Sequence, residues 1–396
     1  MATMRGLISS VRDFVRACER FVRDYTAGLR AHDVRRLFDR EAGQAYDVLA
    51  RDQAGEPEPE DGFHRFWYRV KVVFLGLSYK LTPARRLLFA GSMVFFLIGL
   101  LDIDLWRGSA FRFSLSWLWF FLSVATLVFL LALELVDRIR VRDELEVARE
   151  LQSDLLPRSI PDLKGYRIAH AYRTANEVGG DYYDISLLPD GRLAVLVGDA
   201  SGHGMAAGLL MAIANATLKM AMDLDPEPAK VLSLLNLSLC RTGGKRAFMS
   251  LFYALLEPQS GFLTYCCAGH PFPYLRRAGG EIEELGTGGL PLGLRRDLEF
   301  SAQTTRIEPA ELLVLFSDGI PEGVNRAGDS FGYDRLRDLV ASGGSPRALH
   351  ERILLAFDEY LEDEPLRDDF SLVVLGRSAA AEGATRVPPP PPPTTT

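Results

Sequence analysis

Four aspartates lie where apolar, strand-like runs of the sequence begin or end. They are Asp181 in NEVGGDYYD, Asp199 in VLVGDASGHG, Asp318 in LVLFSDGI and Asp368 in RDDFSLVVL. Taken singly, each is typical of a turn, because Asp and Gly favour turns. Taken together they indicate more, since strands of one sheet can bring their ends together and clustered carboxylates repel one another unless cations neutralise them.

An all-oxygen cluster suits particular metals and a particular reaction. Without cysteine and with few histidines, carboxylates favour Mg²⁺ or Mn²⁺ over zinc. Two such ions a few ångströms apart can activate a bridging water and polarise a phosphoryl group. These residue types therefore predict phosphoryl chemistry, provided that the fold brings the aspartates together.

The segment 160–377 has the pattern of an α+β domain. Short runs rich in β-branched and aromatic residues alternate with longer helical ones. Consecutive strands joined by short turns, such as LLPDGRL, indicate antiparallel hairpins and not βαβ units. The predicted strands are 166–172, 182–188, 193–199, 248–256, 262–267, 311–316 and 370–375, and the predicted helices are 205–222, 228–241, 333–342 and 346–361.

Seven motifs in this segment occur in an order typical of a known family. They are GGDYYD, GDASGHGMAAGLLMA, AGHPFPYL, GLPLG, LFSDGIPEG, FGYDRL and RDDFSLVVL. Together they resemble the metal-dependent type 2C (PPM-type) protein serine/threonine phosphatases, in the bacterial branch typified by SpoIIE and RsbU. ARELQSDLLP, ahead of them, resembles the linker helix that precedes such a domain. The resemblance covers 144–377, and nothing comparable covers 1–140.

The resemblance implies a fold and a set of site residues. The fold is an α-β-β-α sandwich of two antiparallel sheets flanked by helices, with a binuclear Mn²⁺ or Mg²⁺ centre at one edge. The implied metal ligands are the carboxylates of Asp181, Asp199, Asp318 and Asp368, which are also the implied catalytic residues, and the backbone carbonyl of Ala200. Asp199 is expected to bridge both ions. Asp184 and Asp369 are expected to be structural, and Gly179, Gly180, Gly198 and Gly202 to let the backbone approach the ions.

One motif departs from the family pattern. Where the family commonly has AGHNPP, this chain has AGHPFP, so Pro271 replaces the asparagine. That loop supplies none of the implied ligands, and the change therefore concerns the geometry of a substrate loop.

Other kinds of site receive less support from the residues. SGHG, at 201–204, lacks the GxSxG elbow of a serine hydrolase, and TGGKRA, at 242–247, lacks the first glycine of a phosphate loop. His203 and His270 are expected to pack in loops, because an oxygen-ligand site does not need them. Cys266 and Cys267 are expected to be an apolar pair in a strand.

Two uncharged stretches predict a membrane hairpin. The expected spans are 87–103 and 113–133, and the second is long enough to cross a hydrocarbon core of about 30 Å. Lys80, Arg85 and Arg86 precede the first span, and Arg138, Arg140 and Arg142 follow the second. The positive-inside rule then places both flanks in the cytoplasm. We expect a multi-pass protein of the cytoplasmic (inner) membrane.

The remaining segments complete the predicted organisation. Residues 1–86 form a cytoplasmic region of unknown role, with an amphipathic helix over 7–29; the membrane hairpin occupies 87–136, the linker helix 137–159, the phosphatase domain 160–377 and a disordered Pro-rich tail 378–396. The linker carries a short heptad-like seam of Val141, Leu145, Ala148, Gln152 and Leu155. This seam favours equally a simple connector and a parallel homodimer.

Composition excludes several classes of protein. The chain has 396 residues, of which 48% are hydrophobic and 24% charged, as in folded globular proteins. Its net charge of −7 argues against a nucleic-acid partner. Four scattered cysteines support neither a disulfide framework nor a cysteine zinc site.

The resemblance also implies a reaction and a partner. The expected function is hydrolysis of phosphoserine or phosphothreonine by metal-activated water, without a covalent enzyme intermediate. The implied substrate is a phosphorylated regulatory protein, an anti-sigma-factor antagonist. The alternative is a membrane signalling scaffold that binds a phosphoprotein without hydrolysing it.

Overall fold

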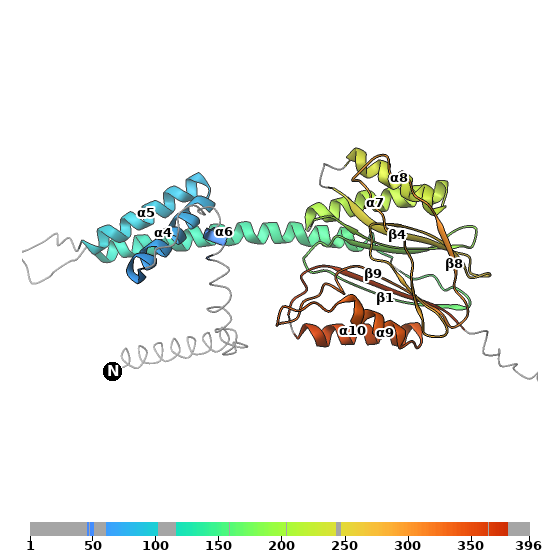
Figure 1. Cartoon of the computed structure of the whole chain (residues 1–396). Helices are drawn as coiled ribbons and strands as arrows, with labels where there is room; N and C mark the ends of the chain where they lie inside the picture. The colour runs from blue at the N-terminus through green and yellow to red at the C-terminus, as the bar shows by residue number, and fades with distance from the viewer. Residues whose placement is uncertain are drawn as a thin grey trace, which may run out of the picture. The chain divides into compact units, whose positions relative to one another are not determined.

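The computed structural model describes residues 46, 48–50, 61–101, 116–157, 159–202, 204–242, 247–362 and 364–378. The chain forms two compact units, Met1–Arg138 and Ile139–Thr396. Figure 1 labels their helices and strands. The helix predicted over 7–29, the loop between the predicted spans, His203 and the proline run of the tail lie outside the described residues.

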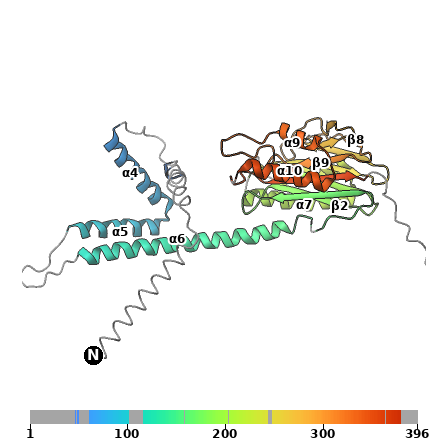
Figure 2. The same cartoon turned by 90° about the horizontal axis from the view of Figure 1, so that it is seen from below.

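The first unit contains a helical hairpin. Its elements are α4 (Gly62–Lys80), α5 (Pro83–Leu100) and the beginning of α6 (Ser116–Ser153), which continues into the second unit. The helices α5 and α6 lie side by side and antiparallel (Figure 2). The Ser123 hydroxyl donates to the Ser92 carbonyl at 2.9 Å. At the other end of the pair, Arg85 forms ion pairs with Glu134 at 3.0 Å and Asp137 at 2.6 Å.

Three described helices are long and apolar enough to cross a membrane, namely α5, α6 and α7 (Met205–Leu224). The helix α7 is a core helix, because it buries Leu210, Met211 and Leu218 against the sheet beneath it. The other two overlap the predicted spans 87–103 and 113–133, whose residues 102–103 and 113–115 lie outside the described residues. Large apolar side chains on them are exposed, including Leu97 and Leu131, each at 59%.

The second unit consists of two five-stranded antiparallel sheets between pairs of helices (Figure 1). One sheet has the order β2-β3-β4-β5-β8 and the other the order β1-β10-β9-β6-β7. The strands are β1 Tyr166–Arg173, β2 Asp181–Leu187, β3 Leu193–Ala200, β4 Met249–Leu256, β5 Phe262–Ala268, β6 Tyr274–Arg276, β7 Ile282–Glu284, β8 Gln303–Arg306, β9 Leu312–Phe316 and β10 Phe370–Arg377. The helices α7 and α8 (Pro228–Thr242) cover the first sheet, and α9 (Tyr333–Ala341) and α10 (Pro346–Leu361) cover the second.

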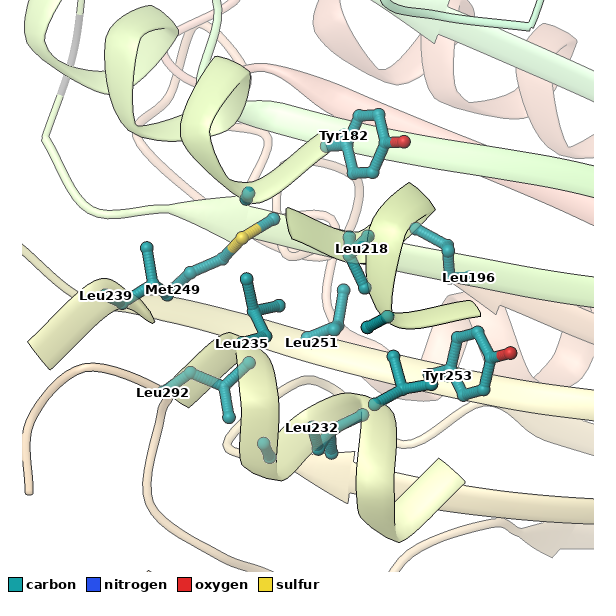
Figure 3. Packing of buried hydrophobic residues seen from close by; sticks show 14 of the residues in the cluster. Tyr182, Leu196, Leu218, Leu232, Leu235, Leu239, Met249, Leu251, Tyr253 and Leu292 are labelled. Carbon is teal, nitrogen blue, oxygen red and sulfur yellow. The ribbon is translucent and has the colours of Figure 1, made fainter. Parts of the chain in front are cut away.

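The alternation of side chains along the strands builds these layers. In β3, Leu196 points toward α7 and α8, where it belongs to the same cluster as Leu218 and Leu235 (Figure 3). Its neighbours Val195 and Val197 point the other way, into the core between the two sheets. A strand buried on both faces is continuously apolar, which is why the sequence of β3 is so easily recognised.

The predicted α+β class and the sandwich of two antiparallel sheets flanked by helices are confirmed. The structure adds three strands that the sequence did not predict: β6, β7 and β8. They have three or four residues each, and every position in β7 and β8 is half-buried or exposed. Such short strands carry no readable periodicity.

The predicted linker is the second half of α6, which ends at Ser153. Val141 is exposed, but Gln152 is only 5% exposed and Leu155 packs against the core of its own domain. The last two positions of the predicted seam are therefore used within the chain. A second helix could contact only the part of the seam formed by Val141, Leu145 and Ala148.

Candidate active site

The two sheets bring the predicted aspartates to one edge of the sandwich. The pairing of β2 with β3 places Asp181 directly opposite Asp199. The strands β9 and β10 are antiparallel neighbours, so Asp318, just after β9, and Asp368, just before β10, lie at the same end of the second sheet. Because β10 also contacts β2, the two pairs of aspartates meet.

Asp181 is held by two buried serines of the other sheet. It is 1% exposed, and its Oδ2 accepts hydrogen bonds from Ser317 Oγ at 2.5 Å and Ser371 Oγ at 2.7 Å. The two serines are themselves connected, because the Ser371 amide donates to Ser317 Oγ at 2.9 Å. Burial raises the pKa of Asp181 to about 8, although the serine hydrogen bonds favour its charged form.

Asp199 and Asp318 are surrounded by negative charge. Burial, and then the charges of Asp181 and Asp318, raise the pKa of Asp199 to about 9. Burial, and then the charge of Asp368, raise the pKa of Asp318 to about 6. The Oδ1 atom of Asp318 is buried and has no hydrogen-bond partner. These carboxylates therefore lie close enough to repel one another, and their charged forms require positive charge at this edge.

Two glycines keep space open beside these oxygens. A Cβ atom on Gly180 would lie 2.7 Å from the carbonyl oxygen of Ala200 and 3.1 Å from Oδ1 of Asp199. A Cβ atom on Gly179 would lie 2.7 Å from Oδ2 of Asp369. A larger residue at Gly180 would place carbon against two oxygens predicted to bind metal, and one at Gly179 would place carbon against the structural carboxylate of Asp369.

Asp369 and Asp184 have other partners. Asp369 is buried and accepts hydrogen bonds from the amides of Ala175 at 2.7 Å and Gly180 at 2.6 Å, so it fixes the backbone that leads into β2. Asp184 is buried and pairs with Lys219 of α7 at 2.9 Å. Both carboxylates thus have structural contacts.

The donor set fits divalent cations that prefer oxygen ligands. Its members are carboxylates and one backbone carbonyl, and they include a buried carboxylate oxygen without a partner. This is the chemistry preferred by Mg²⁺ and Mn²⁺. Within the described residues, no three or more His, Cys, Asp and Glu side chains are grouped so that they could hold a metal ion as they stand. The fit to these cations therefore rests on the chemistry of the oxygen donors.

The end of α6 reaches the loop that precedes Asp181. Gln152 donates to the Gly179 carbonyl at 2.5 Å and accepts from the Gly179 amide at 2.9 Å. Its Nε2 also lies 3.2 Å from Sδ of Met211 in α7. The linker helix is thus hydrogen-bonded to the backbone next to Gly180.

The other residues considered from the sequence have structural contacts. His270 is buried and its Nδ1 lies 2.8 Å from Ser250 Oγ. Burial lowers the pKa of His270 to about 3, so it remains neutral. Cys266 and Cys267 are free thiols in β5, and burial raises the pKa of each to about 11. Such thiols are poor nucleophiles.

We would expect Gln152→Ala to lower the free energy of unfolding, because the amide and the carbonyl of Gly179 would both lose their hydrogen-bond partner. For two buried hydrogen bonds the loss in the free energy of unfolding is about 2 kcal/mol, measured by denaturant unfolding. Ser153→Ala, at the exposed next position, is the control. Equal stabilities of the two variants would contradict a structural role for Gln152.

The fold and the carboxylate edge define the class of protein. The PP2C domain of SiaA from Pseudomonas aeruginosa aligns with a TM-score of 0.54 and 21% identity, over 61% of this chain and 99% of that one. This likeness establishes the fold of a PP2C phosphatase domain.

The family follows from sequence. Residues 189–378 match the family described as Stage II sporulation protein E (SpoIIE). The phosphoserine phosphatase RsbU of Bacillus subtilis is 30% identical over 244 residues, 60% of this chain and 71% of RsbU. Protein IcfG of Synechocystis is 26% identical over 245 residues, 55% of this chain and only 38% of IcfG. The chain belongs to the SpoIIE family of PP2C-type phosphatases.

The sequence pattern singled out the aspartates that lie at this edge, but not the residues that hold Asp181 and Gly179. Ser317 and Ser371 stand within the motifs LFSDG and DDFSL, so their nearness to aspartate was visible. Their shared contact with Asp181, which is more than a hundred residues away in the sequence, was not. Gln152 appeared only as a seam position, since nothing local distinguishes a buried glutamine from an exposed one.

Proposed function

We propose that this protein is a membrane-anchored, metal-dependent protein serine/threonine phosphatase. The observation that supports this most strongly is the meeting of Asp181, Asp199, Asp318 and Asp368 from two sheets at one edge. Membership of the SpoIIE family agrees with this chemistry. RsbU, a relative at 30% identity, is named as a phosphoserine phosphatase.

Different residues of the chain have different roles in the proposed site. We assign metal binding to Asp181, Asp199, Asp318, Asp368 and the carbonyl of Ala200. Two divalent cations held there would supply an activated water and neutralise phosphoryl charge. Ser317 and Ser371 orient Asp181, and Gly179 and Gly180 leave room for the oxygens. No nucleophilic side chain is needed.

The proposed substrate is a phosphorylated regulatory protein, an anti-sigma-factor antagonist. This rests on the resemblance to the SpoIIE and RsbU branch, since fold alone does not select a partner. A comparison of phosphoproteomes between cells with the wild-type chain and cells with Asp318→Ala would identify it. The substrate is the protein whose serine or threonine stays phosphorylated only in the variant.

The activity itself is tested with p-nitrophenyl phosphate and the full chain in detergent. We expect Mn²⁺- or Mg²⁺-dependent release of phosphate, abolished by chelation and restored by added metal. An absence of turnover across a range of both ions, with phosphoprotein binding retained, would favour the scaffold.

We also propose a multi-pass location in the cytoplasmic membrane, with α5 and the first part of α6 as the two spans. Both flanks are then cytoplasmic. A topology reporter fused to the N-terminus and one fused after Arg142 should both give cytoplasmic signals. Signals from opposite sides would mean that only one helix spans.

A homodimer through α6 remains a proposal. Its support is the part of the seam formed by Val141, Leu145 and Ala148, in which Val141 is 55% exposed. Analytical ultracentrifugation of the full chain and of Leu145→Asp would test it. A mass that is unchanged between the two proteins would contradict pairing along the seam.

A further inference from the structure

The helix α4 has an apolar face that is open. Six large apolar side chains fall within an arc of about 100° on a helical wheel at 3.6 residues per turn. Each of them is 40% to 69% exposed. They are Phe63, Phe66, Trp67, Val70, Phe74 and Leu77. The first three lie in the first two turns of α4. In a soluble protein, a helix with such a face would pack it against the hydrophobic core.

The opposite face of α4 already has its protein contact. Val72 and Gly76 are the buried residues of the helix. A Cβ atom on Gly76 would lie 2.7 Å from the carbonyl oxygen of Leu49, so this side is in tight contact with the segment before it. The exposed aromatic face therefore points away from the surface on which the helix packs.

The charged residues of α4 are all basic. Between Gly62 and Lys80 the sequence has four basic residues, Arg65, Arg69, Lys71 and Lys80, and no acidic residue. On the helical wheel, Lys71 borders one edge of the aromatic arc, and Arg69 and Lys80 lie beyond the other edge. Basic residues beside an aromatic face are typical of helices that lie in the interface of an anionic membrane.

The helix is joined to the first apolar span by specific contacts. Arg86, near the start of α5, donates to the carbonyls of Ser78 at 3.1 Å and Tyr79 at 3.3 Å. The rings of Phe74 and Phe89 lie 5.3 Å apart. The face of α4 is therefore continuous with the part of α5 that would enter the hydrocarbon core.

We propose that α4 is an interfacial helix, whose aromatic face inserts into the cytoplasmic leaflet of an anionic bilayer. This rests on the proposed anchoring by α5 and α6, and adds a second, in-plane attachment. Aromatic rings take this position because their apolar bodies enter the acyl region while their edges remain at the headgroups. The net positive charge of α4 favours an anionic leaflet over a neutral one.

The test uses Trp67 as a depth probe in the full chain. The chain has four tryptophans, and Phe replaces Trp106, Trp117 and Trp119 to leave Trp67 alone. The protein is reconstituted into vesicles of phosphatidylcholine and phosphatidylglycerol, with bromine at carbons 6 and 7 or at carbons 11 and 12 of the acyl chains. We expect at least a twofold loss of Trp67 fluorescence with the shallow bromines and a smaller loss with the deep ones.

Two matched proteins make the result decisive. Moving the indole to the next position, by Trp67→Phe with Tyr68→Trp, turns it about 100° away from the apolar face and should weaken the shallow quenching several-fold. Phe129→Trp, without other tryptophans, reports the second span. If Phe129→Trp is quenched by the deep bromines and Trp67 by neither, the spans are correct and the aromatic face of α4 meets protein instead. If neither probe is quenched, the anchoring itself is wrong.

Discussion

Replacing Asp199 with Asn is expected to lower kcat for phosphate-ester hydrolysis by about 10³-fold or more. The side chain lies opposite Asp181 and is acted upon by the charges of Asp181, Asp318, Asp368 and Asp369, so it is the most central carboxylate of the edge. An amide keeps its shape and removes its charge. The change should therefore act on metal binding and not on the fold.

Stability distinguishes this effect from simple damage. Burial and neighbouring charges raise the pKa of Asp199 to about 9, which means that its charged form costs free energy in the metal-free protein. Without metal, Asp199→Asn should therefore unfold at the same temperature as the wild type or higher. With Mn²⁺, the wild type should gain thermal stability and the variant should gain little.

Asp223→Asn is the matched control, because Asp223 is an exposed aspartate near the end of α7. It should keep wild-type turnover and the full Mn²⁺-induced shift in Tm. Turnover of Asp199→Asn within a few-fold of the wild type would refute the bridging role. A lower Tm in metal-free buffer would show that the side chain is needed for the fold instead.

Gly180→Ala is expected to reduce turnover by about 10²-fold or more, because the added methyl group would displace two oxygen atoms that we assign to metal binding. The added methyl would lie 2.7 Å from the Ala200 carbonyl oxygen and 3.1 Å from Asp199 Oδ1. The backbone cannot easily withdraw, since the Gly180 amide donates to Asp369 at 2.6 Å and its carbonyl accepts from Ala200 at 3.0 Å. Either the oxygens move or these hydrogen bonds break.

Steady-state kinetics together with thermal unfolding would separate the two possibilities. Loss of turnover with a Tm close to that of the wild type means that the oxygens moved, and a fall of several degrees in Tm means that the hydrogen bonds broke. Gly279→Ala makes the same chemical change where nothing lies within 4 Å, and should leave both quantities unchanged. Wild-type kinetics in Gly180→Ala would show that this space is not part of the site.

The sequence by itself determined the layers of the domain and the positions of the aspartates. Strands such as β3 and β9 are apolar on both faces because each lies between a helix layer and another sheet, and that pattern is local. Asp199 and Asp318 are recognisable because each lies within a motif, Asp199 at the end of such a strand and Asp318 just after one. The two apolar stretches were also evident, since the length needed to cross a bilayer is a property of a single segment.

The tertiary structure alone decided how those parts are held and used. Ser317 and Ser371 hold Asp181 across two sheets, and Gln152 holds Gly179 across the end of α6. These are contacts between residues distant in the sequence, so neither periodicity nor composition could reveal them. The structure likewise decided which face of α4 is buried, at Val72 and Gly76, and which is left open. Burial depends on what the rest of the chain places beside a helix, and a helical wheel shows only which residues share a face.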